Sequence, residues 1–412
     1  MNILFVHSNF PAQFKHLFSS LCKEKNLSIK FLCQSKEWNS NELNLDKIVT
    51  YNISREVAGD LCHPNLKRFE KAILVAQASL RAAIKLNQQG FKPDLIVGHS
   101  GYGATLYLKE LWPKAKFLGY FEWFYKSSGS DVGFGSNQQM TPDQACRIHT
   151  YNAPILMDLS ICDRAITPTK WQAKQFPDKW KSSFDIIFDG IDTQLFRPRI
   201  EDPPEKGLKI PGIELAKDVP LVTYTTRGFE PYRGWPQVAE GLSLLMQRNP
   251  QVHILLVGSD EVAYGSKRAD GMSWRHWAFQ NFFFDPKRIH FSPPLQYCDY
   301  IKVLQYSWVH VYWTIPFILS WGLMESLSTG CSVVASNTAP VQEIIKPGKE
   351  AILVDFFDPD GMAGRIDELL QNKEHRIYLS NNARNKILNS EYDLKNTLEN
   401  QLQVINDILR KS

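Results

Sequence analysis

Two arginines and two glycines stand together in one short segment. Residues 225–234 read Thr-Thr-Arg-Gly-Phe-Glu-Pro-Tyr-Arg-Gly and follow a predicted strand, so Arg227 and Arg233 share one strand-to-helix loop. A guanidinium binds phosphate oxygens with paired hydrogen bonds. Positive charge here would stabilise a diphosphate leaving group, on which negative charge builds as its bond breaks. An exposed surface loop is the alternative interpretation, and the residues alone do not separate the two.

A second segment, residues 316–336, predicts a helix that is capped by Ser320 and ends at Gly330. The first amides of such a helix point toward an anion, and the helix dipole adds to the attraction. We therefore expect a phosphate of the ligand at this helix start. The candidate donor-binding residues there are Ser320, Trp321, Gly322 and Leu323.

Glu325 lies more than one turn into the same mainly apolar helix. A carboxylate in such surroundings needs hydrogen-bonding partners. Ribose hydroxyls of a nucleotide would serve, and an ion pair with a neighbouring basic residue is the alternative.

The first half of the chain places polar side chains at the ends of predicted strands. Glu122 ends an apolar strand among aromatic residues and would orient a substrate hydroxyl or stabilise developing positive charge, although core packing also explains the aromatics. His99 and Tyr102 follow another strand as candidate ligand contacts, with a structural histidine as the alternative. Asn9 and Ala12 follow the first strand, at a helix start that Pro11 also favours.

Short apolar runs alternate with helical patterns such as Leu66–Leu86, which predicts parallel sheets covered on both faces. The proline-rich stretch 198–219 interrupts the alternation and predicts a linker. We therefore expect an α/β chain of two doubly wound, Rossmann-like domains, residues 1–197 and 220–392, facing a cleft, with a C-terminal helix in 393–412 returning to the first domain. The predicted strands are Ile3–His7, Ser28–Cys33, Leu95–His99, Lys116–Phe121, Arg164–Thr167, Asp185–Phe188, Leu221–Thr225, His253–Val257, Arg288–Phe291, His310–Tyr312, Ser332–Ala335 and Ala351–Val354.

In this order the motifs resemble glycosyltransferase family 4, a retaining family of GT-B fold. Arg227 and Arg233 match its Arg and Lys on the donor diphosphate, and Glu325 matches the second carboxylate of its Glu-x7-Glu motif. Residues 331–336, Cys-Ser-Val-Val-Ala-Ser, resemble its Pro-Val-Val-Ala-Ser strand, and residues 189–198 resemble its Asn-Gly-Val-Asp…Phe-Pro stretch. Residues 348–355 are similar to its Gly-x-x-Gly-Leu-Leu-Val segment.

The resemblance implies transfer of a hexose-type sugar from a nucleotide-diphosphate sugar to a glycan, lipid-linked or other cell-envelope acceptor. It implies retention of configuration and no metal or other cofactor. Glu122, Arg227 and Arg233 are then the catalytic candidates, Ala12 joins the donor contacts, and Asn9, His99 and Tyr102 contact the acceptor or sugar.

Phe317 stands where the family has the first Glu of Glu-x7-Glu. The surrounding string resembles a bacterial branch with Tyr-Pro-Phe-Val-Leu-Ser-Trp at this place. A catalytically silent sugar-binding or scaffold protein is the alternative function. A nucleotide-sugar epimerase is a further one, and the lack of G-x-G-x-x-G after the first strand argues against a dinucleotide oxidoreductase.

The composition narrows the function classes. The 412 residues carry 47 basic and 43 acidic groups, a balance that does not favour nucleic-acid binding. Seven scattered cysteines and no apolar stretch of membrane-spanning length predict a cytoplasmic protein. Alternating bases and aromatics in Thr169–Lys181 suggest peripheral contact with the inner face of a membrane, or else a solvated helix face. Asp358-Pro-Asp360 imitates a metal-binding motif, and a helix cap is the favoured interpretation.

Overall fold

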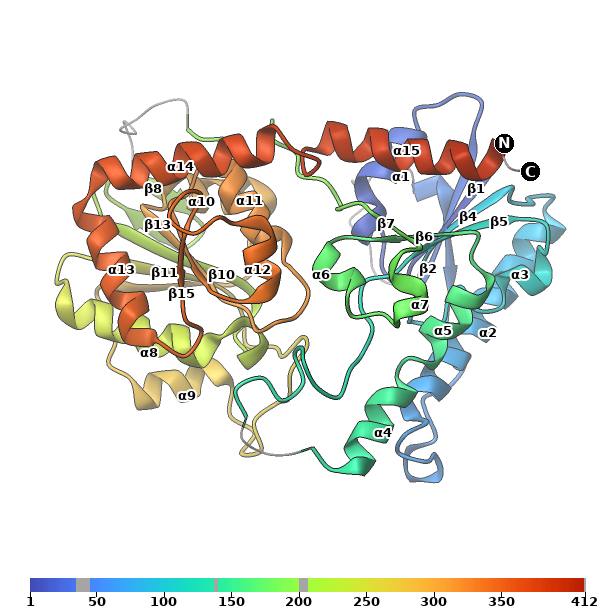
Figure 1. Ribbon diagram of the computed structural model, residues 1–412, viewed down its shortest axis with the longest axis horizontal. Coiled ribbons are helices and arrows are strands. Elements are labelled where there is room, and N and C mark those ends of the chain that lie inside the picture. Colours follow the sequence, from blue (N-terminus) through green and yellow to red (C-terminus); the bar gives the residue numbers. More distant parts are fainter. Residues whose placement is uncertain (35–44, 137–139, 200–206, 411–412) are drawn as a thin grey trace. The chain divides into compact units, whose positions relative to one another are not determined.

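The computed structural model describes residues 1–34, 45–136, 140–199 and 207–410. The chain divides into two compact units (Figure 1). The first unit contains Met1–Gly190 and the C-terminal segment from Leu394, and the second contains Ile191–Asp393. Each unit is built on its own parallel sheet with helices packed against it, so the predicted α/β class with two doubly wound sheets is confirmed.

The sheet of the first unit has seven strands in the order β3-β2-β1-β4-β5-β6-β7, all parallel. The strand order reverses beside β1. In sheets of this kind, ligands bind at the carboxyl ends of the strands next to such a reversal. The sequence did not predict β3. The strands are β1 (Asn2–Val6), β2 (Ser28–Gln34), β3 (Ile48–Tyr51), β4 (Leu95–His99), β5 (Lys116–Tyr120), β6 (Arg164–Thr167) and β7 (Phe184–Ile186).

Strand β1 shows why the first sheet is covered on both faces. Ile3 and Phe5 pack into one hydrophobic cluster, whereas Leu4 and Val6 pack into the cluster on the opposite face. All four side chains are fully buried, as expected for a central parallel strand. The first cluster lies under α1 (Lys15–Leu21) and α15 (Leu394–Arg410), and the second under α2 (Lys67–Gln88).

The C-terminal helix α15 belongs to the first unit, to which the sequence analysis expected residues 393–412 to return. Its apolar residues Val404, Ile405 and Ile408 join the cluster around Phe5, and α15 lies beside α1 (Figure 1). The remaining helices of this unit are α3 (Leu108–Leu111), α4 (Pro142–Thr150), α5 (Ala153–Ile161), α6 (Lys170–Ala173) and α7 (Asp178–Lys181).

The sheet of the second unit has six parallel strands in the order β12-β11-β10-β13-β14-β15. The strands are β10 (Leu221–Gly228), β11 (His253–Ser259), β12 (Ile289–Ser292), β13 (Val309–Tyr312), β14 (Val333–Ser336) and β15 (Ile352–Val354). The helices are α8 (Trp235–Arg248), α9 (Trp274–Asn281), α10 (Tyr297–Tyr306), α11 (Trp321–Thr329), α12 (Ala339–Ile344), α13 (Pro359–Gln371) and α14 (Lys373–Leu388).

Part of the stretch expected to be a linker is ordered structure. Strands β8 (Leu208–Ile210) and β9 (Ile213–Leu215) form an antiparallel hairpin. Leu208, Ile210 and Leu215 pack on Leu255 of the second sheet. The alternation of apolar residues across the Pro211-Gly212 turn produces this hairpin, and the prolines hid it from the sequence prediction.

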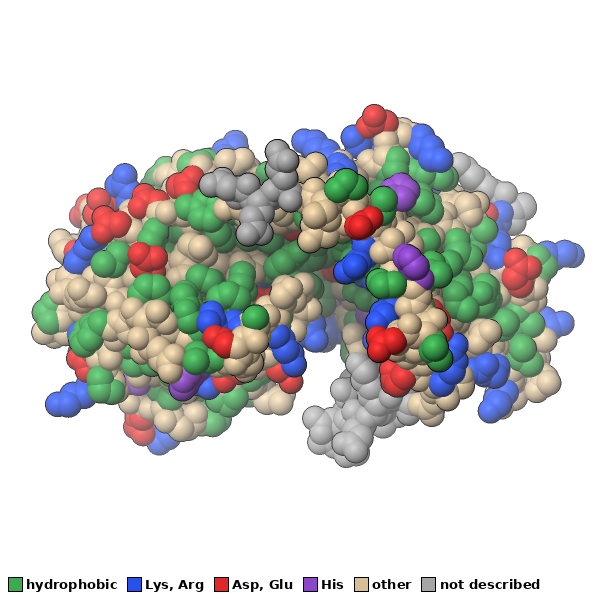
Figure 2. Space-filling view, turned by 90° about the horizontal axis from the view of Figure 1, so that it is seen from below, with side chains coloured by type: hydrophobic (Ala, Val, Ile, Leu, Met, Phe, Trp, Pro, Cys, Tyr) green, Lys and Arg blue, Asp and Glu red, His purple; other side chains and the backbone are tan. Residues whose placement is uncertain are grey.

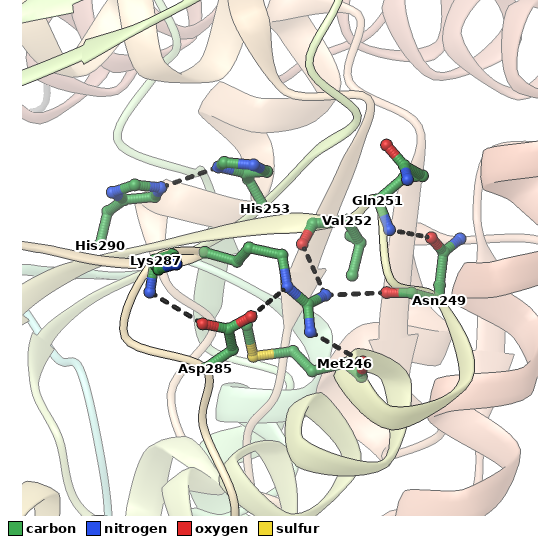
Figure 3. A network of polar contacts seen from close by, with 9 residues as sticks. Met246, Asn249, Gln251, Val252, His253, Asp285, Lys287 and His290 are labelled. Carbon is green, nitrogen blue, oxygen red and sulfur yellow. Dashed lines mark hydrogen bonds and ion pairs between the residues drawn. The ribbon is translucent and has the colours of Figure 1, made fainter.

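A polar network fixes the amino-terminal end of the second sheet (Figure 3). Arg288 donates to Asp285 and to the carbonyls of Met246 and Asn249, which lie at the end of α8. Next to it, His253 Nδ1 and His290 Nε2 lie 3.0 Å apart, with ring planes only 12° from parallel. This geometry is that of a hydrogen bond between the two imidazoles. Because the network lies where the strands begin, it is separate from the loops at their carboxyl ends.

Candidate functional site

In the first unit, Glu122 and His99 come together at the carboxyl ends of adjacent strands. Glu122 follows β5 and His99 ends β4, and His99 Nε2 lies 3.6 Å from Glu122 Oε2. His99 is buried, and its Nδ1 lies 2.9 Å from the carbonyl of Ser100. A proton on Nδ1 would donate to that carbonyl and leave Nε2 turned toward the carboxylate. The two side chains therefore lie side by side at this edge of the first sheet.

The loop after β1 reaches the same carboxylate. Gln13 donates to Glu122 Oε1 at 3.1 Å, and the backbone N–H of Asn9 donates to His7 Nδ1 at 2.7 Å. The ring of His7 meets that of His99 edge-on at 4.6 Å. Ala12 has φ +46°, a left-handed conformation that normally favours glycine. Ala12 therefore holds a backbone conformation that residues with a side chain rarely adopt.

Tyr102 lies next to His99, with ring centroids 5.2 Å apart, and its side chain is 47% exposed. The structure therefore brings the predicted residues Asn9, Ala12, His99, Tyr102 and Glu122 into one group of loops, which we call the first-unit site. Sugar rings commonly pack on exposed aromatic faces beside polar groups, and this group offers both.

A buried carboxylate that the sequence analysis missed supports the first-unit site. Asp158 of α5 is fully buried and accepts hydrogen bonds from Ser100 at 2.7 Å and Thr105 at 2.8 Å. Burial raises the pKa of Asp158 to about 6. These bonds fix both ends of the loop that carries Tyr102. Asp158 lies within an otherwise ordinary helical sequence, so only the fold reveals its role.

In the second unit, Arg233 lies in the loop after β10 and is only 9% exposed. Its Nη1 donates to Thr314 Oγ1 and to the carbonyl of Ile318, each at 3.2 Å. Its guanidinium carbon also lies 5.2 Å from the ring centre of Tyr264. The other guanidinium N–H groups keep the capacity to bind an anion. Arg233 therefore links the two segments that the sequence analysis assigned to the donor.

Arg227 differs from Arg233, because its side chain is exposed and forms no ion pair with the described residues. Its carbonyl accepts a hydrogen bond from Ser259 at 2.8 Å. A change of register lies beside it, where β10 is irregular between Thr225 and Gly228. The structure thus brings Arg233, but not Arg227, onto the residues that precede α11.

Helix α11 begins and ends as predicted. Ser320 is its N-cap and Gly330, with φ +78°, ends it. However, the amides of the first turn already have partners, because Gly322 N donates to Ser320 Oγ at 3.1 Å and Leu323 N to the Ser320 carbonyl at 3.3 Å. The side chain of Leu323 is fully buried, so only its backbone is available to a ligand. An anion here would share these amides with Ser320.

Glu325 is 6% exposed, and its charge acts on the hydroxyls of Tyr297 and Tyr300 in α10. Burial and the nearby carboxylate raise the pKa of Tyr297 to about 12 and that of Tyr300 further. The carboxylate keeps lone pairs for other donors. Three-residue spacing places both tyrosines on one face of α10, but the sequence does not say which carboxylate they meet.

Phe317 is buried in an aromatic cluster that also surrounds Arg233. Its ring lies 5.1 Å from Tyr232 and 5.3 Å from Tyr264. Glu230, which is fully buried, accepts bonds from the amides of Tyr264 and Gly265 and fixes their loop. We call Arg233, Phe317, Glu325 and the start of α11 the second-unit site.

The remaining sequence hypotheses concern metals and membranes. Asp358 caps α13 by accepting from Gly361 N at 2.8 Å, and Asp360 pairs with Arg248, so the capping interpretation is confirmed. Within the described ranges, no three His, Cys, Asp or Glu side chains gather as metal ligands would. None of the described helices combines the length and the apolar character that crossing a bilayer requires. Basic and acidic side chains are interspersed on the face shown in Figure 2.

Comparison with protein families finds two matches. Residues 25–196 match a family described as "Glycosyl transferase family 4 group", and residues 286–386 match "Glycosyl transferases group 1". Spore coat protein SA of Bacillus subtilis (strain 168) is 22% identical over 241 residues, which are 56% of this chain and 60% of that protein. The match therefore spans less than two thirds of the curated relative.

Solved structures show the same fold along the whole chain. Sucrose-phosphate synthase from Thermosynechococcus elongatus superposes with a TM-score of 0.71 at 17% identity, covering 100% of both chains. Anabaena Alr3699/HepE in complex with UDP-glucose superposes with a TM-score of 0.69 at 13% identity, covering 99% of this chain and 100% of that one. The fold is that of the GT-B glycosyltransferases, with two Rossmann-like domains, and the family matches support a glycosyltransferase of this type.

Proposed function

We propose that this chain is a retaining glycosyltransferase that moves a hexose-type sugar from a nucleotide-diphosphate sugar to a glycan, lipid-linked or other cell-envelope acceptor. The observation that carries the proposal is the position of Arg233. A buried guanidinium reaches the backbone before α11, and α11 carries Glu325 one turn further on. This combination suits a diphosphate next to a pentose.

The donor binds to the second-unit site in this proposal. Arg233 and the start of α11 bind the diphosphate, Arg227 adds positive charge from the exposed loop, and Glu325 accepts from the ribose hydroxyls. Tyr297 and Tyr300 stand next to the Glu325 carboxylate and restrict the side from which a ribose reaches it. The structural neighbour Alr3699/HepE was solved in complex with UDP-glucose, and a uridine nucleotide is accordingly the first donor to test.

The chemical step breaks the bond between the anomeric carbon and the diphosphate oxygen. The negative charge that develops on that oxygen is stabilised by Arg233 and the helix start, so no metal is needed in this scheme. The acceptor hydroxyl attacks from the face that the diphosphate leaves, and its proton passes to the departing phosphate. Glu122, with His99 beside it, orients that hydroxyl or stabilises positive charge on the sugar.

The proposed location is the cytoplasm, with Thr169–Lys181 as a candidate peripheral contact with the inner face of a membrane. None of the seven cysteines, all of which lie in the described residues, forms a disulfide bond, which is the state that a reducing compartment maintains.

A catalytically silent nucleotide-sugar-binding protein is the second candidate, and Phe317 favours it, because no carboxylate stands at this point of the site. Turnover separates the two functions. The purified chain should release nucleoside diphosphate from one member of a panel of nucleotide sugars, and Arg233→Ala should abolish the release. NMR of the product should show the donor's anomeric configuration. Binding without release in the presence of an acceptor extract would favour the silent protein.

A further inference from the structure

Arg68 lies against two aromatic rings in the first unit. It lies in the first turn of α2, and its guanidinium carbon is 4.3 Å from the ring centre of Tyr125 and 4.8 Å from that of Tyr151. It also donates a hydrogen bond to the Tyr125 hydroxyl. Contacts with two rings restrict the positions that the guanidinium can take, which prepares it to bind an anion.

The two rings are themselves held in place. Asn152, which is 1% exposed, accepts from the amide of Tyr125 at 2.8 Å and donates to the Tyr125 carbonyl at 2.9 Å. Tyr151 directly precedes Asn152, and its ring meets that of Tyr125 at 85°. One buried amide therefore positions both rings and, through them, Arg68.

The charge of Arg68 is not neutralised by a carboxylate. Within the described part of the chain Arg68 forms no ion pair, whereas Arg55 nearby is paired with Glu70 at 2.6 Å. A cation in the first turn of a helix also faces the positive end of the helix dipole, which is an unfavourable place for it. The N-cap, Leu66, supplies no side-chain hydrogen bond to the free amides. A bound anion would relieve both costs.

The position of this cluster relates it to the first-unit site. Tyr125 is three residues beyond Glu122. Burial is the main cause of the raised pKa of Tyr125; Arg68 opposes this shift, and the charge of Glu122 adds to it. From α4, Arg147 reaches Asn65 at 3.5 Å, next to the start of α2. A second arginine thus stands near the same helix end.

We propose that Arg68, Tyr125 and Tyr151 bind an anionic group of the acceptor, either a phosphate or a carboxylate. The proposal rests on the proposed function in one respect, namely that the first unit receives the acceptor. The anion binds the free N–H groups of Arg68, and Tyr125 and Tyr151 keep the guanidinium in place.

Four small probes distinguish the sources of the anion. Methyl β-D-glucuronide carries a carboxylate and geranyl phosphate a phosphate, and methyl β-D-glucoside and geraniol are their neutral counterparts. Calorimetry with the full chain should show one anionic probe binding at least about tenfold more tightly than its neutral counterpart. Arg68→Gln should lose that preference, and Arg68→Lys should weaken it several-fold, because charge remains but the paired hydrogen bonds do not.

Lys71→Gln is the matched control, because it removes the same charge from an exposed position on α2, one turn away. It should keep the preference within about twofold. Equal binding of charged and neutral probes, or an unchanged preference in Arg68→Gln, would overturn the proposal. If Arg68→Gln does not fold, as judged by circular dichroism, an unchanged affinity in Arg68→Lys overturns it instead.

The same variants are titrated with uridine, guanosine and adenosine diphosphates. Unchanged nucleotide binding in Arg68→Gln is expected, because Arg68 belongs to the first unit. If no nucleotide binds to the wild-type chain, the proposed function fails, while the comparison of anionic and neutral probes still decides the role of Arg68.

Discussion

The ring of Phe317 lies 5.3 Å from the ring of Tyr264, centre to centre, with the two planes at 64°. Phe317 is buried, and Tyr264 also faces the Arg233 guanidinium. The position at which the resembled family has a carboxylate is therefore part of an aromatic cluster in this chain. A Glu side chain at 317 would have to enter that cluster.

Phe317→Glu should consequently destabilise the second unit. Losing a buried aromatic ring and burying a carboxylate should together cost roughly 3 kcal/mol or more of unfolding free energy. Phe317→Leu, which keeps the site apolar, should cost about half as much. Urea unfolding of both variants measures the difference. Equal stabilities of Phe317→Glu and the wild type would show that the ring packing is unimportant.

Glu325 and its two tyrosines should act together on donor affinity. Glu325→Gln keeps the shape but accepts hydrogen bonds less strongly, so nucleotide binding should weaken at least about tenfold. Tyr300→Phe removes a hydroxyl that stands next to this carboxylate, and a smaller loss, about two- to fivefold, is expected. Calorimetry with the nucleotide that the wild type prefers provides both values. A stronger effect of Tyr300→Phe than of Glu325→Gln would contradict this order.

Glu122→Gln should separate chemistry from donor binding. The substitution removes the charge 3.6 Å from His99 Nε2 but keeps an acceptor for Gln13. We expect kcat to fall by about 10²-fold, the usual size of an acid–base or charge-stabilising contribution, with donor affinity unchanged. Steady-state kinetics and nucleotide titration on the same preparation test this. If Glu122→Gln instead loses nucleotide affinity, Glu122 contributes to donor binding and not to the chemical step.

Buried histidines should make the fold sensitive to acid. Burial lowers the pKa of His310 to about 3, while an unfolded histidine titrates near about 6.5. Between these values only the unfolded chain binds the proton, so stability falls as the pH drops below about 6.5, by up to about 1.4 kcal/mol per pH unit. Burial lowers the pKa values of His253 and His290 as well. Asp158 acts in the opposite direction, because its raised pKa lets the folded chain take up a proton first between about pH 6 and 4.

Urea unfolding at pH 6.5 and pH 5 checks this account. His310→Asn should reduce the loss of stability between the two values by about 1.7 kcal/mol, because the unfolded histidine goes from half to almost fully protonated. His276→Asn, at an exposed position of α9, is the control and should leave the slope unchanged. An unaltered slope in His310→Asn would mean that His310 is protonated in the folded chain.

The parts of the fold that could be predicted are those that depend on residues close together in the sequence. The ends of α11 follow from Ser320 and Gly330, and the start of α13 follows from Asp358, because capping depends on a few neighbouring residues. The hairpin 208–215 was misjudged as linker, since its apolar residues are stabilised only by packing on Leu255.

The sequence identified which residues belong to the candidate site, but it did not identify the side chains and carbonyls that they contact. Arg233 and Glu325 were identified from their place in loop and helix. Their contacts with Ile318 and with Tyr300 join segments distant in the sequence, and these contacts exist only after folding. The same applies to Asp158, whose bonds to Ser100 and Thr105 span more than fifty residues.

Titration of nucleoside diphosphates into the wild-type chain and Arg233→Gln tests the central claim most directly. Arg233→Gln removes the charge but keeps a donor for Thr314 and Ile318, and Arg248→Gln, an exposed arginine of the same unit, is the control. The wild type and the control should bind one of the uridine, guanosine or adenosine diphosphates equally, and Arg233→Gln at least about tenfold more weakly. Equal affinity of Arg233→Gln and the wild type, or no binding to the wild type, would contradict the account.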